Sequence, residues 1–332
     1  MRRFVIILFI VCLPVVVYLS GPRFPKPYLS DTLPVVTINT HNAEHYVDSI
    51  ESLHKIRPDN QARIVWYNDS LKQKTEYAVL YIHGFGACWF DGSPTHTCFA
   101  RSIGANLYLS RLASHGIDTT EALIDMYPDS LYNSAKQALL IAHALGDKVI
   151  VMSTSTGGTL ALKLAADFPD LVNSLILLSP NIAINNPAVF LVSGPWGFQI
   201  AKKVGGGGLY RHLTSSSEND SKYWYKKERW ESVVYLQQLI DATMKKEVFK
   251  KVKQPVFLGY YYKNEKEQDP EVKVSAMLKM FDQLGTPDSL KMKVAFPDAD
   301  THVIGCSEFS KSYYDVEMEI LRFARKVGIA AQ

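Results

Sequence analysis

A serine at position 155 lies in a setting that suits a nucleophile. Residues 153–157 read Ser-Thr-Ser-Thr-Gly; they follow an apolar run and precede a helical pattern. A sharp turn from a strand into a helix exposes a serine Oγ at the sheet edge, and the helix N-terminus favours the developing negative charge. The positions two before and two after the nucleophile must be small, as Ser153 and Gly157 are. We therefore expect Ser155 to be a nucleophile; the alternative is a Ser/Thr-rich helix cap.

A serine nucleophile needs a base and a group that orients the base. His302 follows the last expected strand, where its imidazole could take the proton of Ser155. Asp269 stands at the start of an expected helix, in the loop after the preceding strand. We favour Asp269 as the carboxylate that fixes the imidazole tautomer. Glu265 and Glu267, in the same loop, remain alternatives.

A glycine-containing loop could stabilise the oxyanion of such a reaction. His-Gly-Phe-Gly at 83–86 directly follows an apolar run. Acyl transfer requires backbone N–H groups aimed at the developing negative charge. We expect the N–H of Phe85 to be one donor and the N–H of Thr156 the other. The alternative is that residues 83–86 form an ordinary glycine-containing turn without a role in catalysis. This chemistry requires neither a metal nor an organic cofactor, and we expect none.

The stretches that would position these residues alternate between strand and helix patterns. The strand patterns lie at 62–67, 77–82, 106–111, 148–152, 174–178, 255–262 and 291–296. The helical patterns lie at 134–145, 158–166, 272–284 and 312–327. Such alternation predicts an α/β fold with a mainly parallel sheet that is flanked by helices on both faces.

The order Ser155, Asp269, His302, with a glycine loop upstream, resembles the α/β-hydrolase family and its serine esterases and lipases. The domain that carries the resemblance is expected to span residues 62–332. The family usually has glycine where this chain has Ser153. The resemblance implies cleavage of a carboxylic ester through an acyl-enzyme, with a small-molecule acyl ester as substrate. A catalytically inactive binding protein of the same fold, tethered to the membrane, is the alternative, and the reactivity of the serine separates the two.

An insertion of about 70 residues interrupts the alternation. It covers roughly 181–253, where the α/β-hydrolase family places a helical cap. It contains four consecutive glycines at 205–208, which we interpret as a hinge, and a long helical pattern over 223–251. We expect a small helical cap in which Trp224 or Trp230 packs inward; the alternative is a cap that faces a membrane surface.

The first 22 residues predict a membrane segment. Arg2 and Arg3 precede an uncharged stretch over 4–22, near the lower length limit of a spanning helix, and no good cleavage site follows. We expect an uncleaved anchor; a cleaved signal is the alternative. The two arginines place the N-terminus in the cytoplasm and the catalytic domain outside, or secreted if cleavage occurs. Residues 23–61 are expected to form a proline-rich tether and a leading helix.

Composition excludes several other classes. Of the 332 residues, 47% are apolar and 21% charged, which allows a sizeable core. A net charge of +3 is too balanced for a nucleic-acid partner. Four cysteines are too few for a disulfide-built scaffold, although Cys88 and Cys98 could pair in an oxidising compartment. The pattern H-x-x-E-H at 41–45 lacks an identifiable third ligand, so we do not expect a metal site there.

Overall fold

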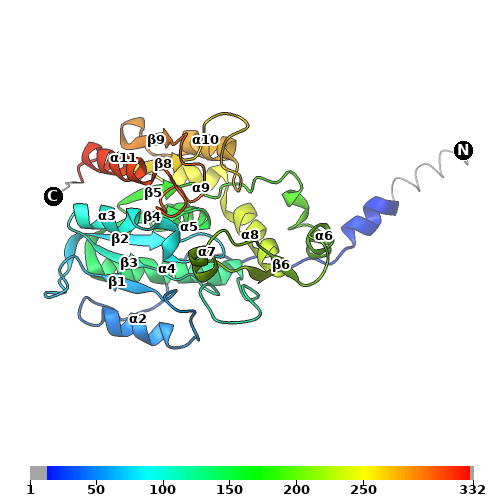
Figure 1. The fold of residues 1–332 in the computed structure, drawn as a ribbon, viewed down its shortest axis with the longest axis horizontal. Coiled ribbons are helices and arrows are strands. Elements are labelled where there is room, and N and C mark those ends of the chain that lie inside the picture. Colours follow the sequence, from blue (N-terminus) through cyan, green and yellow to red (C-terminus); the bar gives the residue numbers. More distant parts are fainter. Residues whose placement is uncertain (1–12, 330–332) are drawn as a thin grey trace, which may run out of the picture.

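The computed structural model describes residues 13–329, and a seven-stranded sheet lies at their centre (Figure 1). The strand order is β1-β3-β2-β4-β5-β8-β9. The strands are β1 (Arg63–Val65), β2 (Thr75–Ile82), β3 (Asn106–Leu109), β4 (Gly146–Thr154), β5 (Ser174–Leu178), β8 (Val256–Tyr260) and β9 (Lys291–Ala295). Strand β1 runs antiparallel to β3, and the remaining neighbours are parallel. The expected mainly parallel sheet is confirmed.

Helices cover both faces of the sheet because its central strands are apolar on both sides. One face packs against α3 (Thr95–Ser102) and α11 (Tyr313–Lys326). The other face packs against α2 (Ala43–Glu51), α4 (Pro128–Leu145), α5 (Thr156–Asp167), α9 (Lys246–Lys251) and α10 (Val274–Gln283).

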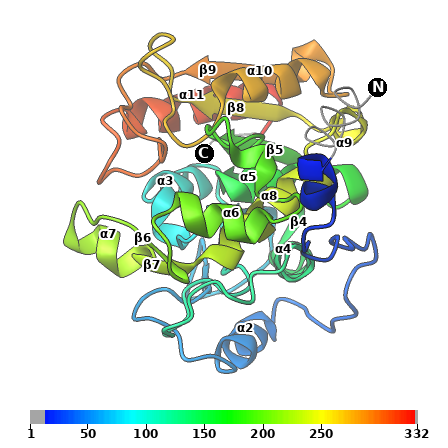
Figure 2. The same ribbon diagram turned by 90° about the vertical axis from the view of Figure 1, so that its right-hand side faces the viewer.

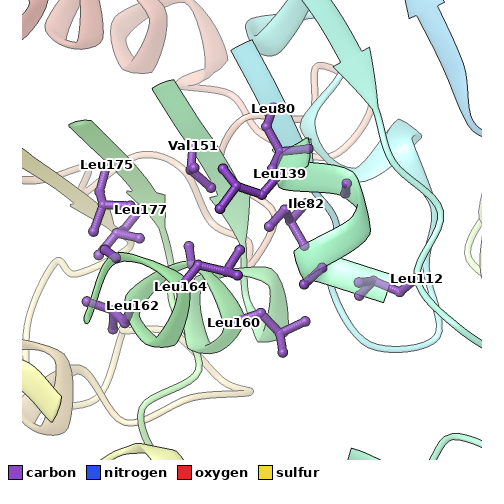
Figure 3. Packing of buried hydrophobic residues seen from close by; sticks show 14 of the residues in the cluster. Leu80, Ile82, Leu112, Leu139, Val151, Leu160, Leu162, Leu164, Leu175 and Leu177 are labelled. Atoms are coloured by element: carbon purple, nitrogen blue, oxygen red, sulfur yellow. The ribbon is translucent and has the colours of Figure 1, made fainter. Parts of the chain in front are cut away.

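Side chains of β2 show how one strand serves both faces. Leu80 and Ile82 belong to the core under α4 and α5, whereas Val79 and Tyr81 belong to the core under α3 and α11. Figure 3 shows Leu80 and Ile82 beside Leu139 of α4. Full burial of an aliphatic side chain of this size contributes roughly 1.5–3 kcal/mol, so the packing on both faces stabilises the strand beneath the site.

Several short elements lie between β5 and β8, in the stretch 181–253 that we call the cap. They are η2 (Val189–Leu191), α6 (Gly197–Val204), β6 (Tyr210–His212), α7 (Glu218–Tyr223), β7 (Lys227–Arg229) and α8 (Trp230–Thr243), with α9 completing the stretch. Figures 1 and 2 show α6, α7, α8 and the β6–β7 hairpin gathered over one end of the sheet.

The expectation of one long helical segment over 223–251 is wrong. Helix α7 ends at Tyr223, and the N–H of Tyr225 donates to the carbonyl of Gly86 in the glycine loop, at 3.0 Å. Residues Lys227–Arg229 then pair with β6 as strand β7. Two separate helices, α8 and α9, follow. Tertiary hydrogen bonds have therefore overridden the local helical pattern.

The predicted membrane segment over 1–22 lies partly outside the described residues. Residues 13–19 are helical. Within residues 13–329, no helix is both long enough and apolar enough to cross a membrane.

The structure also shows the positions of the cysteines and of the H-x-x-E-H pattern. Cys88, Cys98 and Cys306 are free thiols, so the structure does not contain the disulfide that was considered between the first two. In the H-x-x-E-H pattern, Glu44 accepts hydrogen bonds from Trp66 Nε1 and from the Lys72 ammonium group. This glutamate therefore serves as a structural ion-pair partner.

Candidate active site

Ser155 occupies the turn between β4 and α5 with a strained backbone. Its φ is 53° and its ψ is −119°, a conformation that non-glycine residues adopt rarely and at an energetic cost. Its carbonyl accepts a hydrogen bond from the N–H of Asn181 at 2.8 Å, which helps to hold the turn. A Cβ at Gly157 would lie 2.0 Å from the carbonyl oxygen of Ile82. Only glycine fits two residues after the serine, as the sequence pattern requires.

Ser153 takes the position where related chains usually carry glycine. Its side chain is fully buried, and its hydroxyl donates a long hydrogen bond of 3.4 Å to the carbonyl of Ile176 in β5. The turn therefore accommodates one extra hydroxymethyl group without an unpaired buried hydroxyl.

Asp269 and His302 lie side by side at the ends of β8 and β9. Oδ2 of Asp269 is 2.8 Å from Nδ1 of His302. Oδ1 of Asp269 accepts hydrogen bonds from the N–H groups of Glu271 at 2.9 Å and Val272 at 3.1 Å. Because an ionised carboxylate only accepts, Nδ1 carries the proton and Nε2 is left as the basic nitrogen.

The long loop after β8 folds back on itself before it reaches Asp269. Tyr262 forms an antiparallel bridge with Gln268, and the N–H of Asp269 donates to the carbonyl of Tyr261 at 3.2 Å. The extra residues therefore form a small hairpin-like loop, and Asp269 lies back near the end of β8.

The alternative carboxylates, Glu265 and Glu267, lie on that loop. Glu265 accepts a hydrogen bond from the hydroxyl of Tyr262 at 3.0 Å. Glu267 pairs with Lys263 and Asn264, and all these groups are exposed. The structure therefore brings Asp269, and neither glutamate, to the histidine.

Burial and pairing act in opposite directions on this pair. Burial disfavours the imidazolium ion, but the Asp269 carboxylate outweighs it and raises the pKa of His302 above its ordinary value. Burial also disfavours ionised Asp269, whereas His302 and the two backbone N–H groups lower its pKa below the usual value. An anionic aspartate thus favours positive charge on the imidazole, as a base requires after it accepts a proton.

The glycine loop after β2 is fixed by the ring of His83. Its Nδ1 donates to the carbonyl of Gly84 at 2.8 Å, while its Nε2 accepts from the N–H of Leu112 at 3.1 Å. Phe85 borders the cavity described below, and Thr156 is the first residue of α5, directly after the serine. A Cβ on Gly84, the residue before Phe85, would lie 3.1 Å from Cβ of Ser155, so the glycine loop passes close to the serine turn.

A buried aspartate that the sequence did not reveal connects this loop to the serine turn. Oδ2 of Asp91 accepts from the N–H of Gly84 at 2.7 Å, and its Oδ1 accepts from the Tyr81 hydroxyl at 2.6 Å. The Tyr81 hydroxyl also lies 2.8 Å from Oγ1 of Thr154, the residue before the serine. Burial raises the pKa of Asp91 to about 7. Because no motif surrounds Asp91, only the fold identifies it.

Ser155 and His302 open onto one cavity of about 770 Å³ between the sheet and the cap. Apolar cap side chains line part of it, namely Val189, Val192, Ile200, Val204, Val233 and Leu236. Trp224 and Trp230 also border the cavity, which agrees with the expectation that one of them packs inward from the cap. A polar part of the wall comes from the hairpin and α7 and includes Arg211, Asp220, Lys226 and Glu228. The cavity can therefore receive a ligand with an apolar arm and a polar group.

Solved structures of hydrolases share this fold. One of the metagenome-derived lipolytic enzymes LipS and LipT aligns with a TM-score of 0.66 at 16% identity, over 82% of this chain and 100% of that one. The monoacylglycerol lipase of Paleococcus ferrophilus aligns with a TM-score of 0.57 at 15% identity, over 81% and 98%. Est1E from Butyrivibrio proteoclasticus, bound to ferulic acid, aligns with a TM-score of 0.53 at 16% identity, over 81% and 95%.

At these identities the likeness establishes the fold alone. No curated protein sequence matches the chain. A family model does match, over residues 79–305, and it describes the alpha/beta hydrolase family. This match spans most of the sheet, the glycine loop, the serine turn and the Asp269–His302 pair. The chain belongs to the alpha/beta hydrolase family.

Proposed function

We propose that the protein is a serine hydrolase that cleaves carboxylic esters through an acyl-enzyme. Oγ of Ser155 attacks the ester carbonyl while His302 takes its proton, and the N–H groups of Phe85 and Thr156 stabilise the oxyanion. His302 then returns the proton to the departing alcohol. A water attacks the acyl-enzyme with His302 as base, and His302 then passes that proton to Oγ of Ser155 as the C–Oγ bond breaks and the carboxylic acid leaves. Asp269 orients the imidazole throughout.

One observation carries this proposal. A serine in a strained strand-to-helix turn shares a cavity with a histidine whose Nδ1 is held by a buried aspartate at 2.8 Å. The strained backbone is retained although it costs on the order of 1–3 kcal/mol, which is typical of functional sites. A catalytically inactive binding protein, the alternative, would keep the fold but show no reactivity at Ser155.

The apolar cap lining supports an acyl ester as the substrate. The lipolytic enzyme and the monoacylglycerol lipase with the same fold are consistent with this class. The test is hydrolysis of p-nitrophenyl esters of increasing acyl length by the purified full-length chain in detergent and by its Ser155→Ala variant. We expect turnover by the parent chain, with a preference for acyl chains that fill the apolar lining, and none above background by the variant. Equal rates for both proteins would contradict the serine mechanism.

We also propose that the N-terminal segment holds the protein on a membrane with the catalytic domain outside the cytoplasm. The apolar run over 4–19, preceded by Arg2 and Arg3, supports an anchor. The end of this run contacts the cap: Trp196, just before α6, donates from Nε1 to the carbonyl of Val17 at 3.1 Å, and from its backbone N–H to that of Pro22 at 2.9 Å.

Further contacts continue along the tether. The ring of Phe24 lies 5.3 Å from that of Tyr235 in α8, and Gln238 Nε2 donates to the carbonyl of Pro25 at 2.9 Å. Figures 1 and 2 show the N-terminal helix next to α6. If the run is inserted in a bilayer, these contacts place the cap near the lipid surface.

Membrane fractionation tests the anchor. We expect the full-length protein to resist extraction by alkaline carbonate, to be released by detergent, and to keep its initial methionine or Arg2 on N-terminal sequencing. Release into the medium with an N-terminus near residue 23 would instead establish a cleaved signal. Digestion of the body by protease added outside intact cells would support the outward orientation, and protection would contradict it.

A further inference from the structure

Glu228 of β7 is a buried carboxylate that the proposed mechanism does not use. Its side chain is 0% exposed, yet it borders the cavity that contains Ser155. Neither Oε1 nor Oε2 accepts a hydrogen bond from any residue in the described part of the chain. Arg211 forms an ion pair with this carboxylate, but burial of a carboxylate whose oxygens accept no hydrogen bonds is costly, so a position of this kind requires an explanation.

The hairpin places this carboxylate beside the glycine loop. Arg211 in β6 stands directly opposite Glu228 in the strand register, and its Nη1 lies 3.1 Å from Oε1. The hairpin is joined to the glycine loop by the hydrogen bond from the N–H of Tyr225 to the carbonyl of Gly86. Oε2 of Glu228 lies 3.4 Å from where a Cβ on Gly86 would be. The carboxylate is thus next to the residue that follows the expected oxyanion donor Phe85.

We propose that Glu228, held by Arg211, binds a hydroxyl group of the substrate, so that the enzyme prefers esters that carry a free hydroxyl close to the scissile bond. This inference rests on the proposed ester hydrolysis and adds a substrate class to it. The apolar cap lining takes the hydrocarbon part of the same molecule. Glu228 is a specificity-determining residue in this account, and it takes no part in proton transfer to or from Ser155.

A hydroxyl fits this position better than an ammonium or a carboxylate group. Glu228 and Arg211 carry opposite charges that offset one another, so the pair compensates little of the cost of burying a charged substrate group. Burial raises the pKa of Glu228 to about 7, with Arg211 opposing that rise. Both the ionised and the protonated carboxyl are therefore accessible near neutral pH. A hydroxyl both donates and accepts, so it can pair with either form.

Matched ester pairs test the preference and locate the hydroxyl. In the alcohol arm, kcat/KM is compared for glyceryl monobutyrate and propyl butyrate. In the acyl arm, it is compared for ethyl β-hydroxybutyrate and ethyl butyrate, each rate divided by that for alkaline hydrolysis. We expect the full-length enzyme to favour the hydroxylated ester in one arm by roughly 10-fold or more, as expected when a substrate without the hydroxyl leaves a buried polar group unpaired.

Glu228→Met tests the assignment to this residue, because it keeps a similar length and removes both oxygens that could pair with a hydroxyl. We expect the preference to fall to about 2-fold or less through loss of rate on the hydroxylated ester, with the plain ester changed little. The matched control is Glu218→Met, which replaces an exposed cap glutamate on α7 that does not border the cavity. This control should keep the full preference. If Glu228→Met does not fold, Glu228→Asp, which retains the carboxyl on a shorter stem, should reduce the preference partially.

The outcomes distinguish this inference from the proposed function. Turnover of plain esters with no preference in either arm, or a preference unchanged in the Glu228 variants, would overturn the hydroxyl site and leave the esterase intact. Turnover of none of the four esters would overturn the proposed ester hydrolysis, and the hydroxyl site with it.

Discussion

Oδ2 of Asp269 accepts a hydrogen bond from Nδ1 of His302 at 2.8 Å, although the two residues are 33 positions apart in the sequence. The bond forms because β8 and β9 are parallel neighbours, so the loops that follow them emerge at the same edge of the sheet. The same edge carries the turn with Ser155 after β4. The sheet therefore assembles the site from three separate loops.

The raised pKa of His302 predicts how activity depends on pH. A general base must be neutral, so kcat/KM should be low in acid and rise as the pH passes upward through the pKa of the imidazole. Because Asp269 raises that pKa, the midpoint should lie above the ordinary histidine value of 6.5. A pH profile with a neutral ester checks this. A midpoint clearly below the ordinary value would contradict the role given to the aspartate.

Asp269→Asn should reduce kcat by roughly 10³- to 10⁴-fold and leave KM nearly unchanged. Oδ1 of Asp269 is engaged by two backbone N–H groups, so the asparagine amide nitrogen would face His302. That NH₂ group can only donate, which turns Nδ1 into the acceptor and leaves Nε2 protonated. In the pH profile of any residual activity of this variant, the rise of kcat/KM on the acid side should shift to lower pH.

Asp298→Asn provides the control for that variant, because Asp298 is an exposed aspartate in the loop that leads to His302. It should retain the parent kcat and pH profile. Similar losses in both variants would mean that the effect comes from disturbance of the loop and not from the Asp269–His302 hydrogen bond.

Asp91→Leu should lower kcat by roughly 10- to 100-fold, because leucine has a similar volume and accepts neither of the two hydrogen bonds that the carboxylate accepts. The N–H of Gly84 loses its partner and the Tyr81 hydroxyl keeps only Thr154, which loosens the loop that carries Phe85. Pre-steady-state acylation rates should fall while folding and substrate KM remain close to those of the parent. An unchanged acylation rate would show that Asp91 does not position the loop that carries Phe85.

Gly157→Ala and Ser153→Ala form a matched pair in the serine turn. A Cβ at Gly157 would lie 2.0 Å from the carbonyl oxygen of Ile82, so we expect a loss of about 3 kcal/mol in unfolding free energy, or failure to fold. Ser153→Ala removes only a 3.4 Å hydrogen bond and should cost about 1 kcal/mol or less. Urea unfolding followed by circular dichroism measures both. Comparable stabilities would show that the turn can relax around a methyl group.

The sheet could be predicted from the sequence because its strands are short apolar runs separated by turn residues. Each of the seven strand patterns coincides with a strand of the structure, with ends that differ by a few residues. In the cap, β6 and β7 have three residues each and are held by pairing with one another and by contacts to the hydrolase core. Such tertiary contacts leave no periodic pattern in the sequence. For that reason the sequence pattern predicted a helix over 223–251 where the structure has a strand and two helices.

The residues of the site likewise fall into those that the sequence predicts and those that only the structure identifies. Ser155 and His302 have recognisable local surroundings, and Asp269 could be placed after a strand although its loop is longer than usual. Asp91 and Glu228 have no such surroundings. Their importance depends on burial beside the glycine loop, which arises only when β2, η1 (Trp89–Gly92) and the cap hairpin come together. Single-sequence patterns do not report contacts of this range.

Labelling with a fluorophosphonate tests the central claim most directly, because this probe reacts with activated serines. The full-length chain in detergent, its Ser155→Ala variant and its His302→Ala variant would be labelled in parallel, and the adduct located by intact mass and peptide mapping. We predict one adduct, on Ser155, that is absent from both variants. A folded parent protein that acquires no adduct, or acquires it on another serine, would contradict the proposed nucleophile.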